Sequence, residues 1–447
     1  MTKQVTPQMN LRNLVLTMLE ETESGKKSHI VLKEALDKYS NLDKQKRAFM
    51  TRLFQGTLER QIELDYIINL FSKTPVNKMK PVIRNILRLS VYQLLYMKSV
   101  PQSAVCNEAV KLTAKRKFDR LKGFVNGVLR NIARNLDKIQ YPADEKENLS
   151  VRYSMPKWII DLWSRQYGME KTVFMLEEIY KDRETTIHCN TTKASVDDIV
   201  MNLQHNGIKV TRSPLYDKAL NISGYDSFNR LNVFQSGMIT VQDLSSMMAG
   251  LAANPKKGDY VIDVCAAPGG KSLHMAEMMQ QTGTVEARDL TEYKTRLIQE
   301  NIQRMEYKNV VVKVMDATVL DESSVEKADI VMADLPCSGL GVMNKKSDIK
   351  YHVSLEQIKE LVKLQREILS VVYRYVKPGG TLIFSTCTVN KFENNENVAW
   401  IEENLPLKLK SLSGSLPKQL KGEKGYIQIY PGEYGMDGFF ISAFTRI

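Results

Sequence analysis

The sequence predicts a multidomain protein with an all-α first third, a small α/β module and a C-terminal α/β domain built on a mostly parallel sheet. At 447 residues, the chain exceeds the usual size of one domain. From Asp259 onward, strand-like runs such as DYVIDV, VVVKVM, ADIVMAD and TLIFST alternate with helical segments. This alternation is typical of a parallel sheet covered on both faces. The first third has apolar residues at helical spacing and lacks hairpin patterns.

The first third is predicted to be a helical domain over residues 1–138. The stretch RNILRLSVYQLLYM has apolar residues at helical spacing, Pro101 breaks the chain, and further helical patterns follow Ser103 and cover FVNGVLRNIARN. Residues 136–156 are polar, contain two prolines and show no period. We therefore predict a linker over residues 139–160.

The middle of the chain is predicted to be a small α/β module over residues 161–235. Residues 158–180 read as helical and TTIHCN as a strand. In SVDDIVMNLQHNG, Ser195 is placed to cap a helix that ends before Gly207, and IKVTRS and ALNIS follow as strands. Residues 236–447 form the last predicted domain, and its final segments, YIQIYP and GFFISAFTR, are predicted to pair as a hairpin.

The excess positive charge lies in the first third. The net charge is +12, and residues 1–140 carry 26 Lys and Arg against 12 Asp and Glu, whereas the remainder carries 37 against 39. This asymmetry favours a nucleic-acid-binding module over solubility alone. No run of 18 apolar residues exists, which argues against a membrane span, and the first residues lack the apolar core of a signal peptide.

The positions of the cysteines and histidines indicate the redox compartment of the protein and whether it binds a metal. The five cysteines are scattered, which favours a reducing cytoplasm over a disulfide framework. The five histidines are equally scattered, so we expect no zinc or other metal site. Nothing in the sequence predicts an obligate dimer, and we expect a monomer.

The first strand of the C-terminal domain runs into the Gly-rich turn CAAPGGK, residues 265–271. Small residues let the backbone approach a ligand, and the next helix begins with exposed N–H groups. The spacing is neither GxGxxG nor a P-loop. Asp289, Asp316 and Asp334 end the next three strands. One such Asp is most often a helix cap, but the series predicts a nucleoside-binding crevice.

Two cysteines also follow strand ends, in Asp334-Leu-Pro-Cys337 and Ser385-Thr-Cys387. A cysteine is most often a small buried hydrophobe. However, the strand ends of an open α/β sheet face the ligand crevice. With Cys265 nearby, three of the five cysteines are predicted on one surface, which favours thiol chemistry.

Three motifs, CAAPGGKS, DLPCSGLG and FSTCTVNKFENNENV, resemble those of the Sun-type family of RNA 5-methylcytosine methyltransferases, most closely the bacterial 16S ribosomal RNA methyltransferase B group. AVCNEAVKLTAK resembles its NusB-type RNA-binding domain, and VQDLSSMMAG and YGMDGFFISAF are similar to other parts of the family. The resemblance implies a NusB-like bundle, an RRM-like small RNA-binding module and a Rossmann-like domain with a seven-stranded sheet. It also implies S-adenosylmethionine as cofactor and 16S rRNA, with an unpaired or flipped cytosine, as partner.

The resemblance also implies roles for single residues in the methylation of cytosine carbon 5. Cys387 would be the nucleophile that forms a covalent adduct with the base. Cys337 would assist its breakdown, Asp334 would hold the base, and Lys271 would be a cationic partner. The residues implied to bind the cofactor are Cys265, Ala266, Ala267, Pro268, Gly269, Gly270, Lys271, Asp289 at the ribose, Asp316 at the adenine, and Asp334. One departure is MNKKSDIK, which lacks the proline that the family usually has before DIK.

Other functions remain open at this point. The enzyme could act on another rRNA or tRNA site. A DNA cytosine methyltransferase would use Cys337 as nucleophile instead. A ribosome-assembly or antitermination factor would need neither cysteine. An exocyclic-amine methyltransferase would ordinarily carry a polar-Pro-Pro-aromatic motif in place of DLPC.

Overall fold

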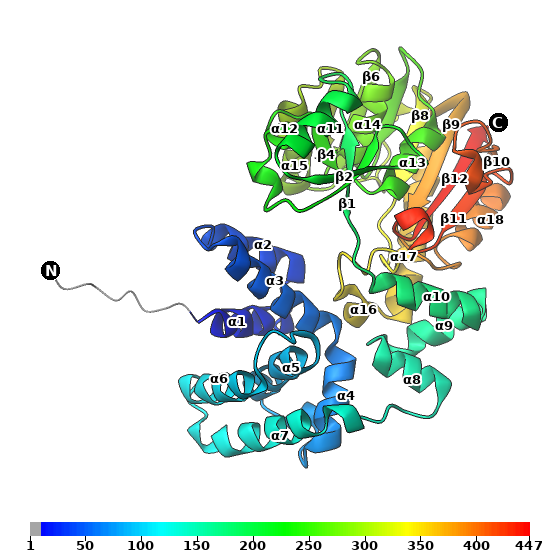
Figure 1. Cartoon of the computed structure of the whole chain (residues 1–447). Helices are drawn as coiled ribbons and strands as arrows, with labels where there is room; N and C mark the ends of the chain where they lie inside the picture. Colours follow the sequence, from blue (N-terminus) through cyan, green and yellow to red (C-terminus); the bar gives the residue numbers. More distant parts are fainter. Residues whose placement is uncertain (1–9) are drawn as a thin grey trace. The chain divides into compact units, whose positions relative to one another are not determined.

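The computed structural model describes residues 10–447, which fall into two compact units (Figure 1). The first unit comprises the chain up to Glu177 together with Lys345–His352, and the second comprises Glu178–Asn344 and Val353–Ile447. Within the described residues, no helix is long and apolar enough to cross a membrane.

The first unit is entirely helical in its regular structure, as predicted. Its helices are α1 Leu11–Glu23, α2 Ser28–Lys38, α3 Lys44–Glu59, α4 Gln61–Phe71, α5 Pro81–Tyr96, α6 Gln102–Lys115, α7 Lys122–Arg134, α8 Glu145–Arg152, α9 Lys157–Tyr167, α10 Met169–Ile179 and α16 Ile349–His352. Figure 1 colours α1–α7 from blue to cyan. Their apolar faces form one core.

Helix α7 shows why this part of the chain folds as predicted. Its buried residues, Val125, Val128, Leu129 and Ile132, recur three or four positions apart and so share one face. The basic Arg130 and Arg134, the latter in its last turn, remain exposed on the other side. The helix therefore packs its apolar stripe inward and presents positive charge to solvent.

Residues 139–160, predicted to be a linker, are not an unstructured segment. They contain α8 and the beginning of α9. Asp144 caps α8 by accepting from the Glu147 N–H at 2.9 Å, and Glu145 and Glu147 lie in its first turn. At eight residues α8 is too short to show a clear apolar period. Residues 161–177, predicted to belong to the α/β module, lie in the helical unit.

The segment MNKKSDIK departs from the family pattern by lacking a proline. Residues 345–352, which include its second half, belong to the helical unit. The Lys350 side chain is buried, with 1% exposure, and its Nζ donates to the carbonyl of Glu59 at 2.9 Å. The Tyr351 hydroxyl donates to the same carbonyl at 3.0 Å. Burial lowers the pKa of Lys350 to about 7, although Glu59 and Glu63 act in the opposite direction.

The small module contains the predicted strands and helix. Its antiparallel sheet has the order β2-β3-β1-β4, with β1 Thr185–Cys189, β2 Lys209–Arg212, β3 Ala219–Ser223 and β4 Ile239–Val241. Helix α11, Val196–His205, is capped by Ser195, as predicted, and a short helix α12 covers Asn232–Gln235. Strand β4 pairs with β1 beyond the predicted boundary at residue 235.

The C-terminal domain is built on a larger sheet of order β10-β12-β9-β8-β5-β6-β7, with β11 paired to β12. The strands are β5 Tyr260–Asp263, β6 Thr284–Asp289, β7 Val310–Val314, β8 Ala328–Asp334, β9 Val376–Thr386, β10 Leu407–Leu409, β11 Tyr426–Ile429 and β12 Phe439–Arg446. Strands β5 to β9 pair in parallel, and β11 and β12 form the predicted hairpin. The eighth strand, β10, is absent from the sequence prediction because three residues show no period.

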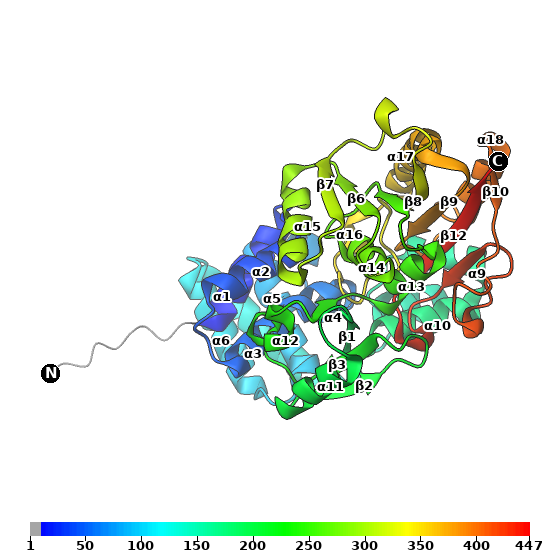
Figure 2. The same ribbon diagram turned by 90° about the horizontal axis from the view of Figure 1, so that it is seen from above.

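Helices cover both faces of this sheet, as predicted, and the strands supply alternate residues to two cores. Val261, Met332 and Ile383 pack in the core with α13 Leu244–Ala253 and α14 Gly270–Met278. Their neighbours in the strands pack on the other face with α17 Leu355–Val372 and α18 Asn395–Asn404. Helix α15, Glu292–Met305, follows β6 (Figure 2). The parallel strands therefore end along one edge, where the predicted site residues lie.

Candidate active site

The two strand-end cysteines lie side by side. Cys337 follows β8 and Cys387 follows β9, and these strands are parallel neighbours in which Asp334 is paired with Ser385. The two Sγ atoms are 3.2 Å apart, and both side chains are half-buried. The predicted convergence of the two cysteine motifs is thus present in the fold.

The two thiols do not have equivalent surroundings. The contact with Cys387, together with burial, raises the pKa of Cys337 well above its ordinary value. The carboxylates of Glu393 and Asp334 add to this effect. Cys337 is therefore held as the neutral thiol, able to donate its S–H toward the Cys387 sulfur.

Lys271 and Asp334 form a close ion pair beside the cysteines. The Lys271 Nζ lies 2.6 Å from one Asp334 carboxylate oxygen, and the Ser385 hydroxyl donates to the other at 2.8 Å. Burial alone would lower the pKa of Lys271, but Asp334, Asp263 and Cys387 more than offset this effect and raise it. Lys271 therefore stays protonated, with its charge paired to the Asp334 carboxylate.

A fully buried carboxylate, Glu393, joins the two cysteine loops. Its Oε1 accepts from the Ser338 N–H at 2.8 Å, and its Oε2 accepts from the Ser338 hydroxyl at 2.5 Å and from the Asn390 amide at 3.0 Å. The Ser338 hydroxyl is also 2.7 Å from that of Thr388. Because Ser338 follows Cys337 and Thr388 follows Cys387, this network fixes the backbone on which both thiols stand.

The Gly-rich turn leads from β5 into α14. Gly269 has φ +104°, a backbone conformation that favours glycine, and an added Cβ would meet Ile298 at 3.2 Å. Within the part of the chain that the structure describes, no side chain caps the first N–H groups of α14. A helix start of this kind suits a carboxylate such as that of an amino-acid moiety.

Of the two predicted acids Asp289 and Asp316, only Asp289 contacts this turn directly; Asp316 lies two residues beyond the end of β7. Asp289 accepts from the N–H groups of Ala267 and Leu290 at 3.0 and 2.8 Å and pairs with Lys294 at 2.8 Å. Asp316 is exposed and accepts from the Thr318 N–H at 2.9 Å. The uncapped start of α14 and the glycine at position 269 suit the amino-acid part of a ligand, and the strand-end carboxylates suit a nucleoside. S-adenosylmethionine is an amino acid linked to a nucleoside.

Cys265, the third site cysteine, is a neutral thiol like Cys337. Burial, with the nearby carboxylates of Asp263 and Asp289, raises its pKa, so that the thiol stays neutral. Its place in the turn after β5 agrees with a packing or cofactor-contacting side chain.

Two buried acids near the site escaped the sequence reasoning. Asp263 is the last residue of β5 and accepts from the Ser272 hydroxyl at 2.6 Å, and burial raises its pKa to about 7. The strand-end rule that selected Asp289 and Asp334 also selects Asp263. The polar run FENNEN, which begins at Phe392 after β9 ends at Thr386, is the signal in the sequence that includes Glu393.

Two further motifs meet near the Gly-rich turn. The Asp437 N–H, from YGMDGFF, donates to the Asp243 carboxylate, from VQDLSS, at 3.1 Å. A Cβ added to Gly270 would lie 3.5 Å from Gln242. Segments at the two ends of the C-terminal domain therefore pack around α14.

A mostly parallel sheet with a Gly-rich turn after β5 fits an S-adenosylmethionine-dependent methyltransferase, whose cofactor would bind at the carboxyl ends of the strands. Comparison with known families agrees. Residues 250–445 match the 16S rRNA methyltransferase RsmB/F family, residues 9–134 the NusB family, and residues 155–227 the ferredoxin-like domain of RsmF/B-like methyltransferases.

Relatives match over nearly the whole chain. The probable ribosomal RNA small subunit methyltransferase B of Bacillus subtilis (strain 168) is 34% identical, covering 98% of this chain and 99% of the relative. The enzyme named ribosomal RNA small subunit methyltransferase B in Cronobacter sakazakii is 30% identical with the same coverage. The crystal structure of PH0851 covers 98% of this chain and 99% of its own, with a TM-score of 0.83 and 28% identity. The chain belongs to the RsmB/F family of S-adenosylmethionine-dependent 16S rRNA methyltransferases.

Proposed function

We propose that this rRNA methyltransferase modifies carbon 5 of a specific cytosine in 16S rRNA through a transient bond between Cys387 and carbon 6 of the base. The observation that carries the proposal is the pair of thiols 3.2 Å apart at the ends of β8 and β9. Methylation of an exocyclic amine or of a ribose hydroxyl needs no thiol. Two adjacent thiols suit a reaction in which one sulfur must first add to the ring and then leave.

Cys387 is assigned as the nucleophile. Lys271 provides positive charge beside it, and Cys337 is held neutral and can donate a hydrogen bond to its sulfur. Both effects favour the thiolate at Cys387. When this thiolate forms a bond to carbon 6, the electron pair of the 5,6 double bond is displaced toward the rest of the ring, and carbon 5 becomes nucleophilic. Bound S-adenosylmethionine supplies the electrophilic methyl group that carbon 5 accepts.

Asp334 and Cys337 are assigned to the base and to the release step. Asp334, whose carboxylate is held by Lys271 and Ser385, would bind the amidine edge of the cytosine. After methylation, a water molecule accepts the proton of carbon 5, the electron pair of that C–H bond re-forms the 5,6 double bond, and the bond between Cys387 and carbon 6 breaks with its electron pair returning to the sulfur. Cys337 is close enough to that sulfur to assist this release.

The same reading assigns the remaining site residues to the donor. Residues 265–271 would contact its methionine end through the turn and the start of α14, Asp289 its ribose and Asp316 the adenine side, with Asp334 between donor and base. The first unit, with its exposed Arg130 and Arg134, would hold flanking RNA phosphates. The target cytosine would have to be unpaired or flipped out of the helix. We propose that the enzyme acts as a monomer in the cytoplasm, without a metal.

The test is bisulfite sequencing of 16S rRNA from cells with the gene, without it, and with a Cys387→Ala copy. We expect one cytosine that resists conversion in the first strain only. The proposal is wrong if that cytosine stays protected without the gene, or if the Cys387→Ala copy restores protection. Protection that is lost in tRNA or at another rRNA position would instead favour the alternative substrate.

A further inference from the structure

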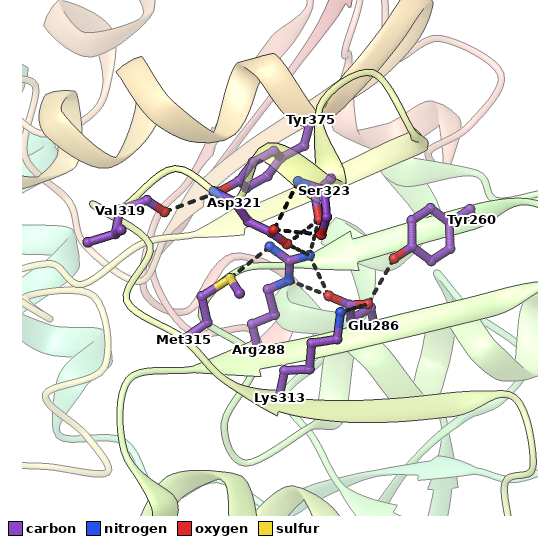
Figure 3. Close-up of polar contacts among 10 residues, drawn as sticks. Tyr260, Glu286, Arg288, Lys313, Met315, Val319, Asp321, Ser323 and Tyr375 are labelled. Carbon is purple, nitrogen blue, oxygen red and sulfur yellow. Dashed lines mark hydrogen bonds and ion pairs between the residues drawn. The ribbon is translucent and has the colours of Figure 1, made fainter.

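Arg288 is a buried charged residue that none of the assigned roles uses. It lies in β6 immediately before Asp289, and its side chain is 1% exposed (Figure 3). Its carbonyl accepts a hydrogen bond from the Ala266 N–H, in the Gly-rich turn, at 2.8 Å. Since neighbouring residues of a strand point to opposite faces, its guanidinium leaves the sheet on the side away from the Asp289 carboxylate.

The Arg288 guanidinium contacts residues at both ends of the loop formed by residues 315–324. One terminal nitrogen lies 2.9 Å from the Met315 sulfur, at the beginning of the loop. The other donates to the Ser324 hydroxyl at 2.5 Å, at the end of the loop. The same nitrogen donates to the Asp321 carboxylate at 3.3 Å (Figure 3). This loop contains Asp316, the residue assigned to the adenine side of the donor.

Tyr375 completes the support of the loop. Its ring centre is 5.1 Å from the guanidinium carbon of Arg288. Its hydroxyl accepts from the Asp321 N–H at 3.0 Å and donates to the Val319 carbonyl at 3.3 Å (Figure 3). Arg288 thus holds side chains of the loop, and Tyr375 holds its backbone.

The charge of Arg288 is balanced on the other side by Glu286. Its Nε donates to one Glu286 oxygen at 2.6 Å, while Lys313 and Tyr260 each contact the second oxygen at 2.8 Å. A buried ion pair of this kind gives little net stability over apolar packing. Its effect is geometric, because a guanidinium presents its donors in a rigid fork.

We propose that Arg288 is a positioning residue for methyl-donor binding. Through its carbonyl it anchors the turn under the methionine end, and through its guanidinium it anchors the loop on the adenine side, so that the two halves of the donor site are held at one residue. The inference rests on the proposed assignment of residues 265–271 and Asp316 to the donor.

The experiment measures S-adenosylmethionine binding by isothermal titration calorimetry to wild type, Arg288→Met, Arg288→Lys and Ser324→Ala. We expect Arg288→Met to raise the Kd by about 5- to 30-fold, the equivalent of about 1–2 kcal/mol. Arg288→Lys should recover only part of the affinity, since one ammonium cannot span Met315 and Ser324. Ser324→Ala should weaken binding less. In methylation assays the KM for the donor should rise while kcat at saturating donor stays near wild type.

Arg366→Met is the matched control. Arg366 is a partly buried arginine of the same unit that donates to the Asn397 side chain at 2.9 Å and lies over the Trp400 ring, both in α18. The Arg366→Met variant should have a lower melting temperature but an unchanged donor Kd.

An unchanged donor Kd in folded Arg288→Met overturns the inference, as does an equal loss of affinity in Arg366→Met. If Arg288→Met does not fold, wild-type affinity in Ser324→Ala overturns it. A wild-type protein that binds no S-adenosylmethionine overturns the proposed function as well, so the two failures are distinguishable.

Discussion

Replacing the buried Glu393 with glutamine tests whether this carboxylate fixes the two cysteine loops. Glu393 accepts from Ser338, Asn390 and Gln365, and the backbone N–H and the two amide groups can only donate to it. A glutamine has one acceptor oxygen, so its own amide group must face one of these donors. Only the Ser338 hydroxyl, which can turn toward Thr388, can adapt.

The loss of stability in Glu393→Gln follows from the number of donors left without an acceptor. One buried donor without an acceptor costs about 1–3 kcal/mol. We therefore expect Glu393→Gln to unfold with a free energy lower by that amount. In the variant the two cysteine loops can shift away from their reactive positions, which raises the activation free energy of methyl transfer. Each 1.4 kcal/mol of that increase should slow methyl transfer by about tenfold. Donor binding, which depends on other segments, should not change.

The measurements are urea unfolding, single-turnover methyl transfer to 16S rRNA and donor Kd. Glu396→Gln is the control, because Glu396 is exposed in the first turn of α18 and its loss should cost less than about 1 kcal/mol. Full stability and full activity in Glu393→Gln would refute the reasoning. An equal loss in Glu396→Gln would also refute it.

Three further predictions concern single charges and thiols. The pKa of Lys350 falls from 10.5 in the unfolded chain to about 7 in the folded protein. Between these two pH values the folded state binds fewer protons than the unfolded state, so the free energy of unfolding rises with pH. This group alone should add about 2 kcal/mol to wild-type stability between pH 7 and 9. Lys350→Met should lose that gain in urea unfolding at the two pH values; an undiminished gain contradicts the burial argument. Lys271→Met should slow alkylation of Cys387 by iodoacetamide by about tenfold, since it removes the positive charge that favours the thiolate; an unchanged rate contradicts this role. Diamide should take two electrons and two protons from Cys337 and Cys387 to form an intramolecular disulfide, seen as a mass loss that dithiothreitol reverses and that is absent in Cys337→Ala. Failure to form this bridge contradicts the observed proximity.

Much of the fold could be predicted because its periodicities are long and unambiguous. The alternation of strands and helices from Asp259 onward and the apolar stripe of α7 are local consequences of side-chain spacing. Short elements were missed for the same reason: α8 and β10 are too short to establish a period. The membership of residues 345–352 in the helical unit could not be predicted, because it depends on Lys350 and Tyr351 reaching a single carbonyl.

The site followed from one rule, that parallel strands end at the same edge of the sheet. This rule brings Cys387 next to Cys337 and Asp334, although Cys387 lies 50 residues beyond Cys337 in the sequence. It does not reveal which buried groups support them. Glu393 and Arg288 act through side-chain hydrogen bonds to other segments, and no local spacing encodes those partners.

The most direct test of the central claim is the covalent bond itself. Cys337→Ala and Cys387→Ala proteins are incubated with S-adenosylmethionine and 16S rRNA, denatured, and analysed for protein–RNA adducts by electrophoresis and peptide mass spectrometry. We predict that Cys337→Ala accumulates an adduct whose linked residue is Cys387, and that Cys387→Ala forms none. An adduct in Cys387→Ala, or an active Cys387→Ala beside an inactive Cys337→Ala, would contradict the account and assign the nucleophile to Cys337.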